Sequence, residues 1–202
     1  SDLETYKMLQ PSSLYGVTKL SNELMASLSF RDSNTRSRGL RFFSVYGPAG
    51  RPDMAYFQAI AAVISGSQFV QFGDGEVKRD FTYIEDVIES VTKLEKELRN
   101  RKSGFHDVVN IGGGSPISLN DLLRIIQVNL GASLKKTKLD SVPEDLNLTE
   151  ADFSYLESLI DKSKFIGIQD GITKTIDWFK LFSSERVKEW SESITKGSSN
   201  RD

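Results

Sequence analysis

The chain has 202 residues, of which 38% are hydrophobic and 10% aromatic, enough to bury the core of one large or two small domains. Its 26 basic residues are balanced by 28 acidic ones, which excludes the broad positive surface that nucleic-acid backbones require. It has no cysteine and a single histidine, His106, so disulfides, thiolate chemistry and ordinary zinc sites are excluded and no metal is expected.

The hydrophobic pattern along the chain alternates between helical and extended segments. Apolar residues at helical spacing predict helices over residues 14–30, 54–64, 85–99, 118–130 and 171–182. Apolar runs bounded by glycine or proline predict strands over residues 40–46, 69–72, 79–83, 108–111 and 134–139. Such an alternation favours an α/β fold with parallel strands joined through helices.

The ends of two predicted helices carry local signals. Gly66 follows the second helix and can end it in the left-handed conformation. Ser118 and Asp121 resemble a capping box that opens a later helix, and Gly131 can end that helix. A last helix over residues 184–194 is expected to be peripheral, followed by a disordered polar tail.

Neither export nor membrane insertion is indicated by the sequence. No apolar run approaches the roughly 18 to 20 residues that cross a bilayer, and the first residues are acidic rather than basic. We therefore expect a cytoplasmic protein with neither a membrane nor a nucleic acid as partner.

Tyr15 and Lys19 stand four residues apart on the first predicted helix, so both side chains lie on one face, about one turn from each other. A nearby ammonium stabilises a phenolate relative to a phenol, and a phenolate can remove the proton of a sugar hydroxyl. The spacing is common by chance in helices, so its context decides whether the pair is functional.

That context consists of four segments in fixed order. They resemble the extended short-chain dehydrogenase/reductases of the NAD-dependent epimerase/dehydratase family, and they cover residues 11–25, 39–55, 78–87 and 110–117. The second, Gly-Leu-Arg-Phe-Phe-Ser-Val-Tyr-Gly-Pro-Ala-Gly-Arg-Pro-Asp-Met-Ala, is similar to the segment that marks UDP-glucuronate 4-epimerases. The resemblance implies NAD as the cofactor, a UDP-sugar as the substrate and a 4-keto sugar as the intermediate.

The resemblance also implies roles for individual residues. Tyr15 matches the catalytic base, and Lys19 matches the residue that holds the nicotinamide ribose and tunes the tyrosine. Arg79 matches the arginine that binds the substrate diphosphate, a task suited to a planar, permanently charged donor fork. The alternative for Arg79 is a surface ion pair with Asp80 or Asp86.

Three further residues are implied by position. Arg51, with the hydroxyl of Ser44, matches the group that contacts the sugar carboxylate and holds it in plane. Asp145 matches the acidic residue that hydrogen-bonds the uridine ribose, although Glu144 replaces the usual glycine of that loop. Solvent-exposed loop positions are the alternative for Arg51 and Asp145, and an ordinary strand-end hydroxyl for Ser44.

The fold that the resemblance implies is a partial Rossmann-like doubly wound sheet with an interleaved, smaller substrate-binding α/β domain. Residues 1–46 and 81–116 are assigned to the dinucleotide-binding domain, residues 47–80 and 117–182 to the substrate domain, and residues 183–202 to the peripheral helix and tail. The family's glycine-rich pyrophosphate loop and catalytic Ser/Thr are absent from this chain, so we expect it to be the later portion of a longer enzyme, which forms a homodimer.

Two classes of function remain open from sequence. The chain belongs to an epimerase, or it is a non-catalytic module that retains affinity for UDP-sugars. Within the enzyme class, a UDP-glucose 4-epimerase, a UDP-glucuronate decarboxylase and a dTDP-sugar dehydratase are the alternatives.

Several conspicuous residues are interpreted as structural. His106 is expected in a loop, and Trp178 and Phe179 are expected to pack in the core. The three glycines of residues 112–114 lack the six-residue spacing of a dinucleotide fingerprint, so they predict a turn rather than a phosphate nest.

Overall fold

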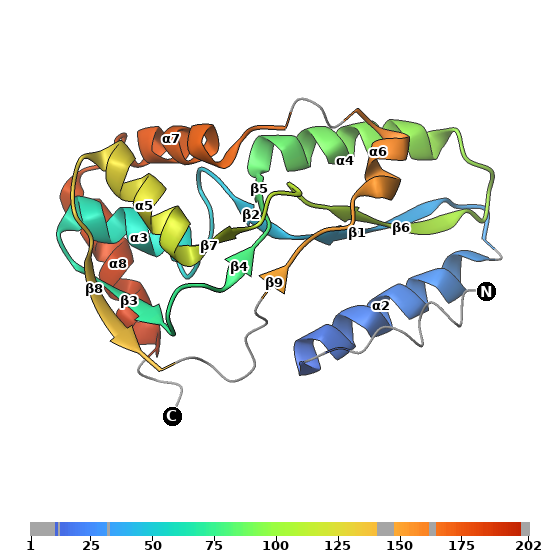
Figure 1. Ribbon diagram of the computed structural model, residues 1–202. Coiled ribbons are helices and arrows are strands. Elements are labelled where there is room, and N and C mark those ends of the chain that lie inside the picture. Colours follow the sequence, from blue (N-terminus) through green and yellow to red (C-terminus); the bar gives the residue numbers. More distant parts are fainter. Residues whose placement is uncertain (1–10, 12, 32, 141–147, 162–164, 199–202) are drawn as a thin grey trace.

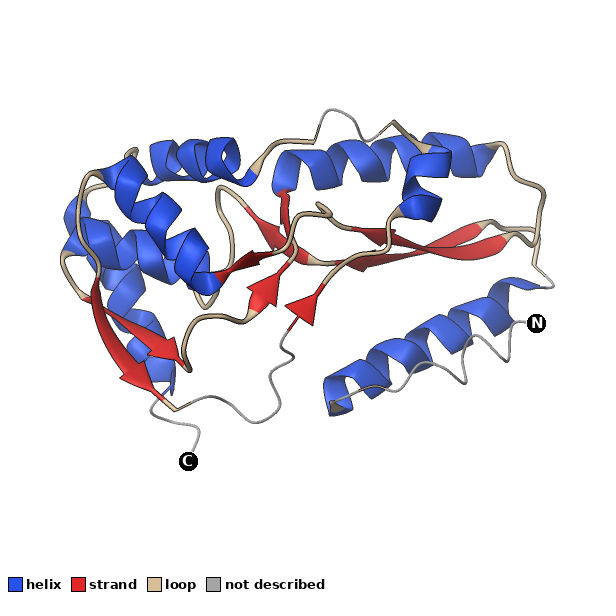
Figure 2. Cartoon of the chain, in the orientation of Figure 1, coloured by secondary structure: helices blue, strands red, loops and turns tan. Residues whose placement is uncertain are grey.

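The computed structural model describes residues 11–198 apart from 12, 32, 141–147 and 162–164. Its helices are α2 (Leu14–Arg31), α3 (Ala55–Ser65), α4 (Ile84–Arg99), α5 (Leu119–Leu130), α6 (Ser154–Leu159), α7 (Ile168–Phe179) and α8 (Ser184–Ser198). Its strands are β1 (Ser37–Phe42), β2 (Ser44–Tyr46), β3 (Gln68–Phe72), β4 (Lys78–Arg79), β5 (Phe81–Tyr83), β6 (His106–Ile111), β7 (Ile117–Ser118), β8 (Lys135–Leu139) and β9 (Leu148–Thr149). The alternation of helices and strands confirms the α/β class (Figure 2).

The described strands form four short sheets. β1 pairs in parallel with β6, from Ser37 opposite His106 to Phe42 opposite Ile111. The β2–β5 and β3–β8 pairs are also parallel, whereas β4 pairs antiparallel with β7 and parallel with β9. In Figure 1, α2 lies against one face of the β1–β6 pair and α4 and α6 lie on the other, which is the layering of a doubly wound sheet.

The single strand predicted over residues 40–46 is wrong, because the chain changes partners at Phe43. The Phe43 N–H donates to the Ile111 carbonyl over 3.2 Å, and the next N–H, that of Ser44, donates to the Asp80 carbonyl over 3.0 Å. The first segment therefore belongs to the β1–β6 sheet and the second to the β2–β5 sheet. The hydrophobic pattern of a segment does not indicate which strand will pair with it.

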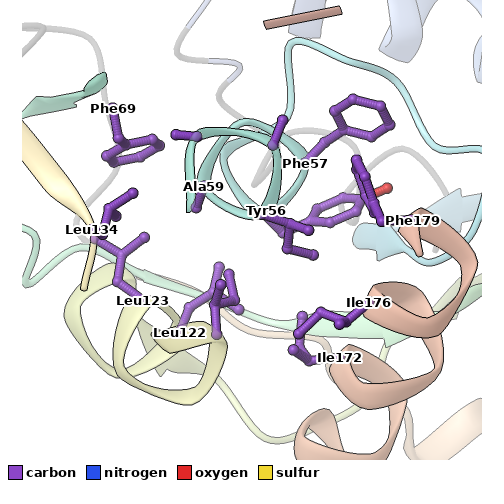
Figure 3. Close-up of a cluster of buried hydrophobic side chains, with 14 of the residues drawn as sticks. Tyr56, Phe57, Ala59, Phe69, Leu122, Leu123, Leu134, Ile172, Ile176 and Phe179 are labelled. Carbon is purple, nitrogen blue, oxygen red and sulfur yellow. The ribbon is translucent and has the colours of Figure 1, made fainter. Parts of the chain in front are cut away.

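α3 lies at the centre of the larger hydrophobic core. Six of its residues are buried, and Figure 3 shows side chains of β3, α5 and α7 surrounding it. Gly66 ends this helix with φ of 71°, the left-handed conformation that glycine adopts without steric cost. The end predicted for the helix is thus confirmed.

A second, smaller core lies between α4, α6 and β6. Its buried members are Val87, Leu94, Val109, Ile111, Leu156 and Ile160. The division of residues 1–182 into two interleaved domains stays a prediction.

The expectation of a peripheral last helix is wrong. α8 packs against α3, with Val187 fully buried and Trp190 stacked on Trp178 at 5.8 Å between ring centroids. Phe179 and Trp178 join this aromatic group, as predicted. Residues 196–198 are helical rather than disordered, and residues 199–202 lie outside the described part. The residues that anchor α8, Val187 and Trp190, are three positions apart, which predicts a helix but does not indicate what the helix packs against.

His106 also differs from its prediction. It is the first residue of β6, where its Nδ1 lies 2.9 Å from the Ser37 Oγ and its ring stacks on Phe30.

Within the described residues, no helix is both long and apolar enough to cross a membrane.

Candidate active site

α2 presents the Tyr15–Lys19 pair. Ser13 caps the start of this helix, since its Oγ accepts the Gly16 N–H over 3.1 Å. One turn separates the two side chains, and the Lys19 Nζ lies 5.0 Å from the centre of the Tyr15 ring. This cation–π contact holds the ammonium beside the phenol, and 70% of the Tyr15 surface stays exposed to a ligand.

The pair lines a groove of about 730 Å³ between α2 and β1. The opposite wall is formed by β1 residues that include Leu40 and Phe42. This groove is open to solvent and has both a cation and an aromatic hydroxyl on one wall, so it can receive a polar ligand with a flat ring.

An ion pair fastens α2 to the sheet. α2 has no buried residue, yet its Glu23 accepts two hydrogen bonds from Arg41 of β1, at 2.7 Å from Nε and 2.6 Å from Nη2. Bidentate pairing restricts both position and rotation, so it sets where α2 and its tyrosine lie relative to β1.

Arg51 lies in the loop between β2 and α3. The Tyr56 hydroxyl supports this loop by donating to the Gly47 carbonyl over 3.2 Å. The Arg51 Nε donates to Asp53 Oδ1 over 3.0 Å and its Nη2 pairs with Asp53 Oδ2, while both side chains remain largely exposed. The guanidinium fork thus already holds one carboxylate.

The Asp53 carboxylate determines the electrostatics of Arg51. Its hydrogen bond and its charge raise the pKa of Arg51 above the ordinary value, and the Tyr15 phenol adds only the smallest contribution. Ser44 is half-buried at the start of β2, where its backbone is held by Asp80.

Arg79 stands at the edge of a second hollow, a cavity of about 290 Å³. Most of the lining is apolar and comes from β3, β5 and the segments beside them: Phe69, Val70, Phe72, Val77 and Phe81. Asp53, which pairs with Arg51, lines the same cavity as Arg79. The Arg79 Nη1 donates to the Lys78 carbonyl over 3.0 Å.

Two residues near these sites are not indicated by the sequence alone. Asp53 follows Arg51 by two positions in an Arg-Pro-Asp segment, where the two side chains can pair. Asp80 is an ion-pair partner in the sequence prediction, whereas in the structure it is buried and accepts backbone N–H groups. Asp145 lies outside the described residues.

Fold and site together define a parallel α/β protein of the short-chain dehydrogenase/reductase class, with a tyrosine–lysine pair beside the sheet. The chain belongs to the NAD dependent epimerase/dehydratase family, whose model matches residues 1–112.

Individual relatives agree with this assignment. The chain is similar to protein CapI of Staphylococcus aureus, at 36% identity over 84% of this chain and 54% of that protein. It is similar to the UDP-glucuronate 4-epimerase of Thermodesulfobacterium geofontis, at 34% identity over 88% of this chain and 53% of that protein. The chain spans about half the length of these curated relatives.

A solved structure shares the fold. The UDP-glucuronic acid 4-epimerase from Bacillus cereus, in complex with UDP-glucuronic acid and NAD, matches with a TM-score of 0.78 and 35% identity. The match covers 86% of this chain and 55% of that one.

Proposed function

We propose that this chain supplies the catalytic tyrosine and the substrate cavity of an NAD-dependent epimerase that interconverts UDP-glucuronate and UDP-galacturonate. The observation that carries the proposal is the Tyr15–Lys19 pair, whose ammonium lies 5.0 Å from the centre of the phenol ring on the wall of an open groove of about 730 Å³. The pair supplies a proton-accepting group, and Arg51 supplies an exposed carboxylate-binding fork. A hexuronate needs both, because its carboxylate and its C4 hydroxyl lie on different parts of one ring.

The groove beside Tyr15 and Lys19 fits the nicotinamide end of NAD. Its volume of about 730 Å³ accommodates a ring and a ribose, and the exposed Lys19 ammonium can donate to ribose hydroxyls. NAD held there would supply a reversible hydride acceptor for the sugar C4, so no net oxidation would result.

Tyr15 moves the proton in this proposal. As a phenolate it would accept the C4 hydroxyl proton of the sugar, and as the resulting phenol it would give the proton back when the 4-keto sugar is reduced; the Lys19 ammonium lies beside the ring during both steps. The Arg41–Glu23 pair keeps this helix in place against β1.

The cavity at Arg79 suits the nucleotide part of the substrate. Its apolar walls can bury a planar base, and the guanidinium at its edge can bind the diphosphate. Asp53 lies between this cavity and Arg51, so the sugar would extend from Arg79 past Asp53 toward Arg51 and Tyr15.

Arg51 selects the uronate. Its present partner is itself a carboxylate, which supports a role in binding one. A UDP-glucose 4-epimerase would have no use for this fork, and a non-catalytic module would not require Tyr15.

Turnover of purified complete protein with NAD tests the proposal. We expect interconversion of the two UDP-uronates, followed by nuclear magnetic resonance, and loss of activity in Tyr15→Phe. Arg51→Gln should lower kcat/KM for UDP-glucuronate by about 10- to 100-fold, the worth of a bidentate charged contact, and leave that for UDP-glucose unchanged. Preference of the unmodified protein for UDP-glucose would contradict the uronate assignment, and absence of any turnover would favour the non-catalytic module.

The homodimer and the cytoplasmic location stay predictions. Exposed apolar residues on α2, namely Leu24, Met25 and Leu28, support an association of the complete protein through this helix.

A further inference from the structure

Asp80 is a fully buried carboxylate between β4 and β5. Within the described part of the chain, its contacts are with backbone groups rather than with a lysine or arginine. The Gly114 N–H donates to both of its oxygens, at 2.9 and 3.0 Å, and the Ala151 N–H donates to Oδ2 at 3.1 Å. Burial of a carboxylate is costly unless such donors replace water, so these contacts determine where Asp80 can lie.

The glycine turn after β6 is built around this carboxylate. A Cβ at Gly112 would lie 2.8 Å from Asp80 Oδ2, and a Cβ at Gly113 would lie 2.5 Å from the Phe81 carbonyl oxygen. Gly114 has φ of 72°, which glycine adopts freely. The turn therefore leaves room for the Asp80 carboxylate and donates one N–H, that of Gly114, to both of its oxygens.

The backbone of Asp80 adds two further links. Its N–H donates to the Thr149 carbonyl over 3.1 Å, and its carbonyl accepts the Ser44 N–H over 3.0 Å. One residue thus joins the start of β2, the turn after β6 and the segment after β9. All of these segments come from different parts of the sequence.

Two residues attached to Asp80, Arg79 and Ser44, are predicted to contact the substrate. Arg79 directly precedes Asp80 and lines the cavity of about 290 Å³, and Ser44 is held through its backbone. Asp80 and Arg79 share one peptide unit, so a shift of Asp80 is transmitted to the backbone of Arg79 at the end of β4, whose pairing with Ile117 and Thr149 is the other restraint on this residue.

We propose that Asp80 is a positioning residue, whose buried carboxylate, held by the glycine turn, fixes Arg79 at the diphosphate site. The inference rests on the proposed function for the identity of the ligand. It requires no contact between Asp80 and the substrate, so its effect passes entirely through Arg79.

Asp80→Asn in the complete protein tests this role. The amide keeps the shape of the carboxylate but turns a donor group toward the Gly114 or Ala151 N–H. Affinity for UDP, measured by calorimetry, should fall by about tenfold or more, the worth of a charge-assisted contact. In turnover, KM for the UDP-sugar should rise while kcat changes little, since the diphosphate lies away from the reacting carbon.

Asp86→Asn is the matched control. Asp86 is also buried and accepts a backbone N–H, that of Ile166 at 2.9 Å, but it lies in α4 and does not line the cavity. Both variants should lower the unfolding temperature, and only Asp80→Asn should weaken UDP binding. Equal UDP affinity in the two variants would overturn the proposal.

A second variant keeps the test decisive if Asp80→Asn does not fold. Ala151→Pro removes the N–H that donates to the carboxylate, and it also adds a ring at a position that is 4% exposed. It should weaken UDP binding relative to the unmodified protein, and unchanged affinity would again overturn the proposal. The binding measurement uses UDP, which carries no sugar, so it does not depend on the epimerase assignment. If that assignment is wrong, turnover is absent but the difference in UDP affinity between Asp80→Asn and Asp86→Asn remains. If the inference is wrong, that difference in UDP affinity is absent.

Discussion

Two arginine–aspartate pairs at different places in this protein have the same fork geometry and opposite environments. Arg38 of β1 donates to both oxygens of Asp107 at 2.7 Å, with 3% of its side chain exposed. Arg51 makes the same two-pronged contact with Asp53, with 77% of its side chain exposed. Chemistry alone therefore does not decide whether such a pair stabilises a fold or receives a ligand.

Burial and the number of partners make the difference. Arg38 also donates to Glu97 of α4 at 2.7 Å, and Tyr155 of α6 donates to Asp107 at 2.7 Å, so the network connects four elements. Arg51 and Asp53 lie two residues apart on one loop, where water competes for both. The buried pair resists exchange, whereas the exposed pair can exchange its carboxylate for that of a ligand at little cost.

The largest effect is expected from Arg38→Ala. Removing the guanidinium leaves Asp107 and Glu97 without their shared cation in a largely buried place, which should lower the free energy of unfolding by about 3 kcal/mol. Urea denaturation of the complete protein measures this loss in the free energy of unfolding. Arg99→Ala is the control, because this exposed pair with Glu95 lies on the same helix as Glu97 and should cost no more than about 0.5 kcal/mol. Similar losses in the two variants would show that burial does not separate the pairs.

An intermediate effect is expected at Arg41 and Glu23, whose side chains are 38% and 17% exposed. A double-mutant cycle with Arg41→Gln and Glu23→Gln should give a coupling free energy of about 1 kcal/mol, at the upper end for partly exposed pairs. Faster hydrogen exchange in α2 should accompany the loss, since this helix has no buried residue to retain it. If the effects of the two substitutions on the free energy of unfolding are fully additive, the Arg41–Glu23 pair does not hold α2 against the sheet.

The smallest effect on stability is expected at Arg51 and Asp53. Arg51→Gln and Asp53→Asn should leave the unfolding midpoint unchanged, because both side chains are largely in water. Asp53→Asn should instead release the fork and tighten binding of UDP-glucuronate by about two- to fivefold, the scale of one exposed ion pair, with UDP-glucose as the control ligand. Weaker binding of UDP-glucuronate would mean that Asp53 supports the fork rather than occupying it.

Features that depend on near neighbours in the chain were determined by the sequence itself. The end of α3 at Gly66 and the cap of α5, where Ser118 accepts the Asp121 N–H over 3.0 Å, are local interactions, and both were predicted. The Tyr15–Lys19 contact likewise follows from one turn of helix. Family resemblance added the role of that pair and the choice of Arg51 and Arg79.

Features that depend on which segments meet in space were decided only by the tertiary structure. The change of partner at Phe43, the burial of Val187 against α3 and the glycine turn around Asp80 each join residues from distant parts of the chain. The one-dimensional pattern records how hydrophobic a residue is and how regularly it recurs, and it does not record the donor that will lie beside it. For that reason Asp80 appears in the sequence as one charged residue among many, and in the fold as the point where three segments meet.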